Sequence, residues 1–121
     1  MPLGKDGYIQ LFQEVDDSGN PTGPGVSEGA WASAVKTVAV PGTAEQCSSL
    51  AAAPGKAIVF KALDSNTDDV YLGSSQANAQ NAAVRFSLAA GQSLVLYITN
   101  ANLVWVDAAV AAEGICIAVE Q

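Results

Sequence analysis

The chain has 121 residues, half of them hydrophobic but only 7% aromatic, and twelve acidic against five basic residues give a net charge of −7. This length suits a single domain whose core is built from Ala, Val, Leu and Ile. The basic residues are scattered and the apolar stretches are short, which argues against binding to nucleic acid or an anionic membrane surface and excludes a transmembrane helix.

The first part of the chain differs in composition from the rest. It is rich in Gly and Pro, most densely in DDSGNPTGPG at 16–25. A stretch of this kind has too few apolar side chains to pack a core. We therefore divide the chain into an irregular N-terminal arm at 1–34 and a β domain at 35–121.

Within the arm, GYIQLFQEV alternates like a strand, with Ile9 and Leu11 on one side and Tyr8 and Phe12 on the other. One interpretation is that this strand joins the sheet edge of a neighbouring subunit, which makes Tyr8, Ile9, Leu11 and Phe12 candidate partner-binding residues. The other is that it pairs within its own domain as the first edge strand and that the Gly/Pro stretch is a long loop. Both interpretations stay open on the sequence.

The remainder of the chain predicts strands. Short runs rich in Val, Ile, Leu, Phe and Tyr alternate with Gly, Pro, Asn and Asp, which is typical of an all-β sandwich or barrel, here of about seven to nine short strands. The predicted strands cover 35–40, 45–50, 57–63, 70–73, 84–88, 93–98, 103–107 and 114–120. The Ala-rich pieces 76–83 and 107–113 could each form one helical turn, which would not change the fold class.

Two of these strands, 57–63 and 93–98, are apolar on both faces. Strands of this kind need cover on both sides, and a domain of this size has few layers to supply it. Val59, Val95 and Tyr97 are therefore candidate contacts with another subunit or a partner. The alternative is a two-layer sandwich that leaves some apolar surface in water.

Little in the sequence supports catalysis. The chain has no histidine, which removes the commonest general base, the usual Ser–His and Cys–His pairs and most zinc sites. The acidic pairs Asp16–Asp17 and Asp68–Asp69 lie in turns and lack the spacing of a calcium loop. We expect no enzymatic activity, no cofactor and no metal.

Other conspicuous residues have structural interpretations. Cys47 and Cys116 are predicted to be small buried residues rather than a disulfide. Gly73 is expected to end the strand at VYLG with a positive φ. Trp105 is expected in the core, whereas Trp31, at the junction of arm and domain, is a further candidate contact residue.

Three runs carry a resemblance to a known class of protein. They are AIVFKALDSNTDDVYLGSS (57–75), FSLAAGQSLVLYI (86–98) and LVWVDAAVAAEGICIAV (103–119). Together they resemble the small β domains found among the structural proteins of tailed-bacteriophage virions. These motifs are strands and turns, so they transfer no catalytic residues.

The resemblance implies a non-enzymatic virion component that is made in the host cytoplasm. The leading expectation is a capsid decoration, or cement, protein that binds and stabilises the assembled head. Its partner would be the major capsid protein or another virion protein, and the apolar strands favour a homo-oligomer, a trimer before a dimer. The alternative is a tail, fibre or head–tail module that binds a host surface glycan or another virion protein.

Overall fold

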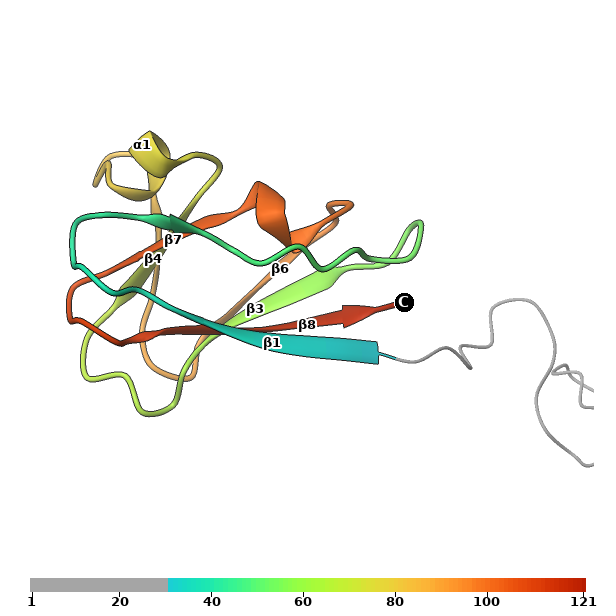
Figure 1. The fold of residues 1–121 in the computed structure, drawn as a ribbon, viewed down its shortest axis with the longest axis horizontal. Helices are drawn as coiled ribbons and strands as arrows, with labels where there is room; N and C mark the ends of the chain where they lie inside the picture. The colour runs from blue at the N-terminus through green and yellow to red at the C-terminus, as the bar shows by residue number, and fades with distance from the viewer. Residues whose placement is uncertain (1–30) are drawn as a thin grey trace, which may run out of the picture.

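The structure is a computed structural model that describes residues 31–121, and these form two antiparallel sheets of four strands each (Figure 1). The predicted all-β sandwich is thereby confirmed, and each predicted run overlaps one strand. The elements are β1 (Trp31–Thr37), β2 (Glu45–Gln46), β3 (Ile58–Ala62), β4 (Val70–Gly73), α1 (Gln76–Ala79), β5 (Phe86–Leu88), β6 (Ser93–Leu96), the 3-10 turn η1 (Ala101–Leu103), β7 (Trp105–Ala108) and β8 (Gly114–Glu120).

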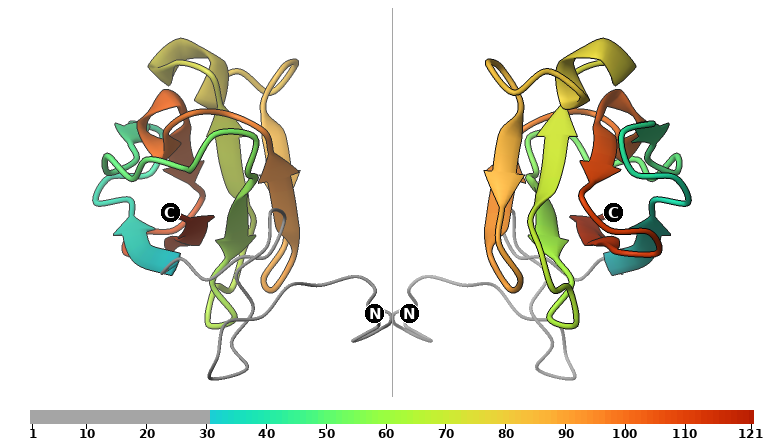
Figure 2. Two further views of the ribbon diagram at one scale, coloured as in Figure 1. Left: turned by 90° about the vertical axis from the view of Figure 1, so that its right-hand side faces the viewer. Right: turned by 90° about the vertical axis from the view of Figure 1, so that its left-hand side faces the viewer.

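The strand order is that of a jelly roll. One sheet has the order β1-β8-β3-β6 and the other β2-β7-β4-β5. Strands from opposite ends of the chain are therefore neighbours, as if one long antiparallel hairpin had been rolled into two packed sheets. Figure 2 shows that β1 and β6, the edge strands of the first sheet, lie on opposite sides of the domain.

The core lies between the facing sides of the two sheets. Ile58 and Phe60 of β3 and Ile115 and Ile117 of β8 are almost completely buried, and they belong to one cluster with Val106 of β7. Successive residues of a strand point to opposite faces. The residues between the buried ones therefore point away from the core.

The first strand includes residues that the sequence analysis assigned to the arm. Residues 31–34 pair with β8, from Trp31 opposite Glu120 onward. Figure 1 accordingly shows the C-terminus beside the start of β1. WASA has few residues of high strand propensity, so its local pattern does not mark a strand. The pairing with β8 keeps it extended.

The two Ala-rich pieces behave differently. The first contains the single turn α1, whose N-terminus is capped by Ser75: its Oγ accepts a hydrogen bond from Asn78 N–H at 3.1 Å. The second forms no helix, because Asp107 and Ala108 continue β7.

Two expectations about single residues were wrong. Trp105 is partly exposed rather than in the core, because the buried residues here are its neighbours Val104 and Val106. Gly73 does not have a positive φ. A Cβ at Gly73 would lie 2.3 Å from the backbone nitrogen of Ala79, so glycine is required because α1 packs directly on the end of β4.

Candidate functional site

One side of the sheet β1-β8-β3-β6 points away from the core and is largely apolar. We call this side the outer face. Its side chains come from alternate positions of the four strands. They are Trp31, Ser33, Val35, Thr37, Val59, Lys61, Ser93, Val95, Cys116, Ala118 and Glu120, followed beyond the end of β6 by Tyr97.

The strand register places these side chains in cross-strand rows. Ser33 lies opposite Ala118, Ala118 lies opposite Val59, and Val59 lies opposite Val95. Neighbouring strands are about 4.8 Å apart, so a row of four residues spans about 14 Å. The row therefore forms a continuous stripe across the whole sheet.

The large apolar side chains of the outer face are open to solvent. Tyr97 is 77% exposed, Trp31 69%, Val35 61% and Val95 49%, and Val59 is partly exposed. Between them, the central strand β8 adds the small side chains of Cys116 and Ala118, and it places Glu120 opposite Trp31. A contiguous exposed patch of this kind marks a contact surface more often than scattered apolar residues do.

Four of the predicted partner-binding residues lie together on this face. They are Trp31, Val59, Val95 and Tyr97. Val35 belongs to the same face, but it was not among the predicted contact residues. Its alternation with Ser33 along the strand was a signal that could have identified it. The sheet pairing that brings β1 beside β8 has no local signature, so the sequence did not show that these residues share one surface.

The other predicted contact residues come from the arm. They are Tyr8, Ile9, Leu11 and Phe12, and they lie outside the described residues.

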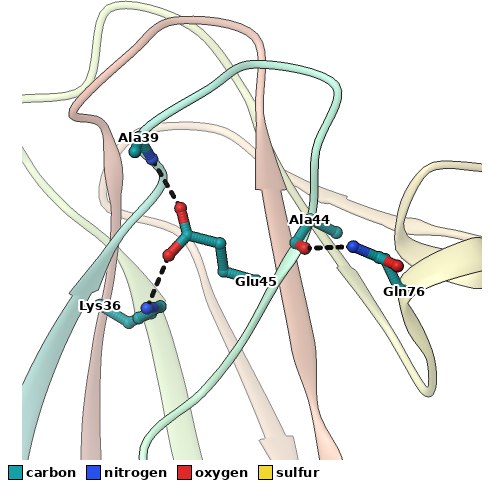
Figure 3. A network of polar contacts seen from close by, with 5 residues as sticks. All are labelled: Lys36, Ala39, Ala44, Glu45 and Gln76. Atoms are coloured by element: carbon teal, nitrogen blue, oxygen red, sulfur yellow. Dashed lines mark hydrogen bonds and ion pairs between the residues drawn. The ribbon is translucent and has the colours of Figure 1, made fainter.

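A polar network ties the β1 edge of the outer face to the second sheet (Figure 3). The carboxylate of Glu45 in β2 accepts hydrogen bonds from Ala39 N–H and from Lys36 Nζ, both at 2.8 Å. Gln76 Nε2 donates to Ala44 O at 3.1 Å, which joins α1 to the same segment. The hydrogen bond from Ala39, followed by that from Lys36, holds the pKa of Glu45 below its usual value.

A second carboxylate holds the turn between β3 and β4. Glu113 accepts hydrogen bonds from Thr67 Oγ1 and Thr67 N–H, both at 2.7 Å, and from Asp68 N–H at 3.2 Å. These bonds, those of Thr67 above all, lower the pKa of Glu113. Both carboxylates are thus arranged to favour their ionised forms.

We expect the free energy of unfolding to fall as the pH drops below the ordinary glutamate pKa of 4.5. A carboxyl whose pKa is lowered by folding stabilises the protein above its unfolded pKa, and this stabilisation is lost as the pH falls through the folded value. In urea unfolding at a series of pH values, Glu45→Gln and Glu113→Gln should each flatten this acid dependence. The control Asp64→Asn removes a carboxylate whose exposed pair with Lys61 contributes little, so it should change the free energy of unfolding at neutral pH only slightly. An unaltered slope in both Gln variants would contradict the prediction.

The described residues offer little reactive chemistry. Burial raises the pKa of the Cys47 thiol to about 12, so this thiol stays protonated. Cys47 and Cys116 are both free, as predicted, although Cys116 is only partly buried because it lies on the outer face. No three His, Cys, Asp or Glu side chains within residues 31–121 lie close enough together to hold a metal ion. The guanidinium of Arg85 lies 3.5 Å from the ring centroid of Tyr71 and so covers one face of that ring.

In the part of the chain that the structure describes, no helix is long and apolar enough to cross a membrane. Comparisons with family models, curated proteins and solved structures find no match for the chain. Its function therefore has to be inferred from its own residues, and the outer face is the surface that calls for an explanation.

Proposed function

We propose that this protein is a non-enzymatic structural component of a bacteriophage virion, a capsid decoration protein that binds the assembled head through its outer face. The observation that carries the proposal is the exposed apolar stripe of the β1-β8-β3-β6 sheet. Covering Trp31, Val59 and Val95 with a partner surface would remove apolar area from water, at about 25 cal/mol per Å². The partner is the major capsid protein or another virion protein.

The size of the outer face fits attachment in many copies. Four short strands cover roughly 300 Å². A stable protein–protein interface buries about 800 Å² on each partner. One subunit would therefore bind weakly through this face alone. Association of subunits on the shell, a trimer before a dimer, would raise the total affinity because the contacts are then linked.

Fold and charge are compatible with this role without specifying it. Jelly rolls occur in viral capsid proteins and in lectins, so the fold supports the proposal by analogy only. The net charge of −7 favours a neutral or basic partner surface.

The alternative, a tail or fibre module that binds a surface glycan, has less support. A sugar ring would stack on an open aromatic face. Trp31 and Tyr97 lie at opposite edge strands of the sheet, and Tyr71 is partly covered by Arg85, so the exposed aromatics form no common platform.

The proposal is tested by adding the purified protein to heads assembled without it. We expect saturable cosedimentation at a fixed ratio to the capsid protein and a higher melting temperature of the shell, because a ligand that binds only the assembled state stabilises it. Heads that bind no protein at micromolar concentrations, together with an unchanged shell melting temperature, would contradict the proposal.

A further inference from the structure

The sandwich has two sides at which an edge strand of one sheet lies beside an edge strand of the other, and these two sides differ. On one side the edge strands β1 and β2 are joined by the ion pair between Lys36 Nζ and Glu45 Oε1 at 2.8 Å. On the other side, between the edge strands β5 and β6, lies an apolar groove of about 450 Å³. We call it the edge groove. Its lining residues are not those of the outer face, and the inference drawn from it does not depend on the proposed function.

The lining of the edge groove is apolar and partly open to solvent. Val84 and Phe86 from the β5 side are 57% and 56% exposed, and Leu103 of η1 is 51% exposed. Leu94 and Leu96 of β6 line the opposite wall. Sandwich interiors are normally packed to the density of organic crystals, so side chains that belong to a core but lie beside such a groove lack neighbours.

The chemistry of the groove favours a polypeptide strand over a small molecule. Small-molecule sites combine apolar walls with a few polar groups placed to orient the ligand. Here the polar lining side chain that the structure describes is Ser74, whose Oγ already accepts a hydrogen bond from Asn78 Nδ2 at 2.9 Å. The groove is instead bordered by two sheet edges, since β5 pairs only with β4 and β6 only with β3 among the described strands. In an antiparallel edge strand, alternate N–H and C=O groups point outward and can accept another strand.

We propose that residues 7–15 of the same chain, GYIQLFQEV, occupy the edge groove as a strand added beside β6. The alternating sequence places Ile9, Leu11 and Val15 on one side, which would enter the groove against Leu94 and Leu96. Tyr8 and Phe12 then point the other way. They extend the outer face beyond Val95.

The connection to β1 is long enough for this arrangement. In the strand register, Trp31 of β1 lies opposite Glu120 of β8. The adjacent row contains Val119, Ile58 and Leu96, and Leu96 is the last residue of β6. Trp31 therefore lies at the end of the sheet where β6 ends. Crossing from β1 to a strand beside β6 covers four strand spacings, about 19 Å. The residues 16–30 can span at most about 50 Å when extended. A tethered segment with millimolar effective concentration outcompetes the same segment of a second copy at micromolar protein concentration.

The test is amide hydrogen exchange over residues 7–15 in the full-length chain, with two pairs of matched variants. Leu11→Asp places a charge on the groove side of the segment, whereas Phe12→Asp places it on the opposite side. Val84→Asp places a charge in the groove, whereas Val40→Asp alters a valine of similar exposure, 58%, in the connection between β1 and β2.

We expect wild-type, Phe12→Asp and Val40→Asp chains to exchange these amides at least about tenfold more slowly than Leu11→Asp and Val84→Asp. Protection of the β3 and β8 amides reports whether Val84→Asp still folds; if it does not, the Leu11→Asp and Phe12→Asp pair decides. Wild-type amides that exchange at the rate of an unstructured peptide would overturn the proposal. Protection that disappears on dilution would also overturn it, because it would assign the groove to the segment of a neighbouring copy. An apolar small molecule retained by the protein in native mass spectrometry would overturn it as well.

Discussion

Replacing Phe60 with alanine should lower the free energy of unfolding by about 3–5 kcal/mol. Phe60 has no exposed surface, and it lies on β3 opposite Ile117 on one side and Leu94 on the other. Removing its ring therefore leaves a cavity between the two sheets that the paired strands cannot collapse to fill. For a domain of this size the melting temperature should fall by about 15 °C or more.

The matched control for this change is Val95→Ala in the neighbouring strand β6. Val95 lies on the outer face and is 49% exposed, so its truncation should cost less than about 1 kcal/mol in the isolated protein. Urea unfolding followed by circular dichroism measures both values. If Phe60→Ala and Val95→Ala had similar effects, the division of these strands into a core side and an outer side would be wrong.

Substituting Val95 or Val59 with aspartate should weaken binding to the head by about tenfold or more, since a buried valine contributes about 1.5–3 kcal/mol and 1.4 kcal/mol corresponds to a factor of ten. The two residues lie opposite each other on the outer face, so either carboxylate would be buried unpaired by a partner covering this row. Cosedimentation with heads measures the affinity. The fold itself should survive Val95→Asp with a loss of about 1 kcal/mol, because the site is open to solvent in the free protein.

Two comparisons make the result specific to the outer face. Val40→Asp introduces the same charge at an exposed valine outside the sheet, and it should bind heads like the wild type. Thermal unfolding of Val95→Asp separates lost binding from lost structure. A variant that unfolds before it loses affinity would show that Val95 serves the core, and equal binding by Val40→Asp and Val95→Asp would remove the outer face from the interface.

Much of the fold was predictable because its signals are local. The alternation of buried and exposed residues in the strand Gly114–Glu120, and the turn at Ala89–Gln92, follow from two-residue periodicity and from glycine at a turn, where Gly91 has a φ of +81°. Boundaries were less predictable where tertiary pairing overrides propensity. The WASA run is held extended by β8, and the start of the predicted strand at 103 is taken up by η1, where Asn100 Oδ1 accepts a hydrogen bond from Asn102 N–H.

The outer face was predictable only as separate residues. Val59, Val95 and Tyr97 were identified because their strands are apolar on both faces. Trp31 joins them because β1 pairs with β8. This pairing places Trp31 opposite Glu120, which lies far from it in the sequence. The edge groove likewise depends on where β5 and β6 separate into different sheets, and the requirement for glycine at 73 depends on the packing of α1. Contacts of this kind have no signature in the local sequence.

The most direct test of the central proposal, that the outer face docks this protein onto a phage head, is electron cryomicroscopy of phage heads to which the purified protein has been added. We predict density for the jelly roll on the surface of the head, with the β1-β8-β3-β6 sheet turned toward the shell and Trp31, Val59 and Val95 in contact with a capsid subunit. A particle whose head lacks this density, or one in which the outer face points to solvent while another surface makes the contact, would contradict the claim.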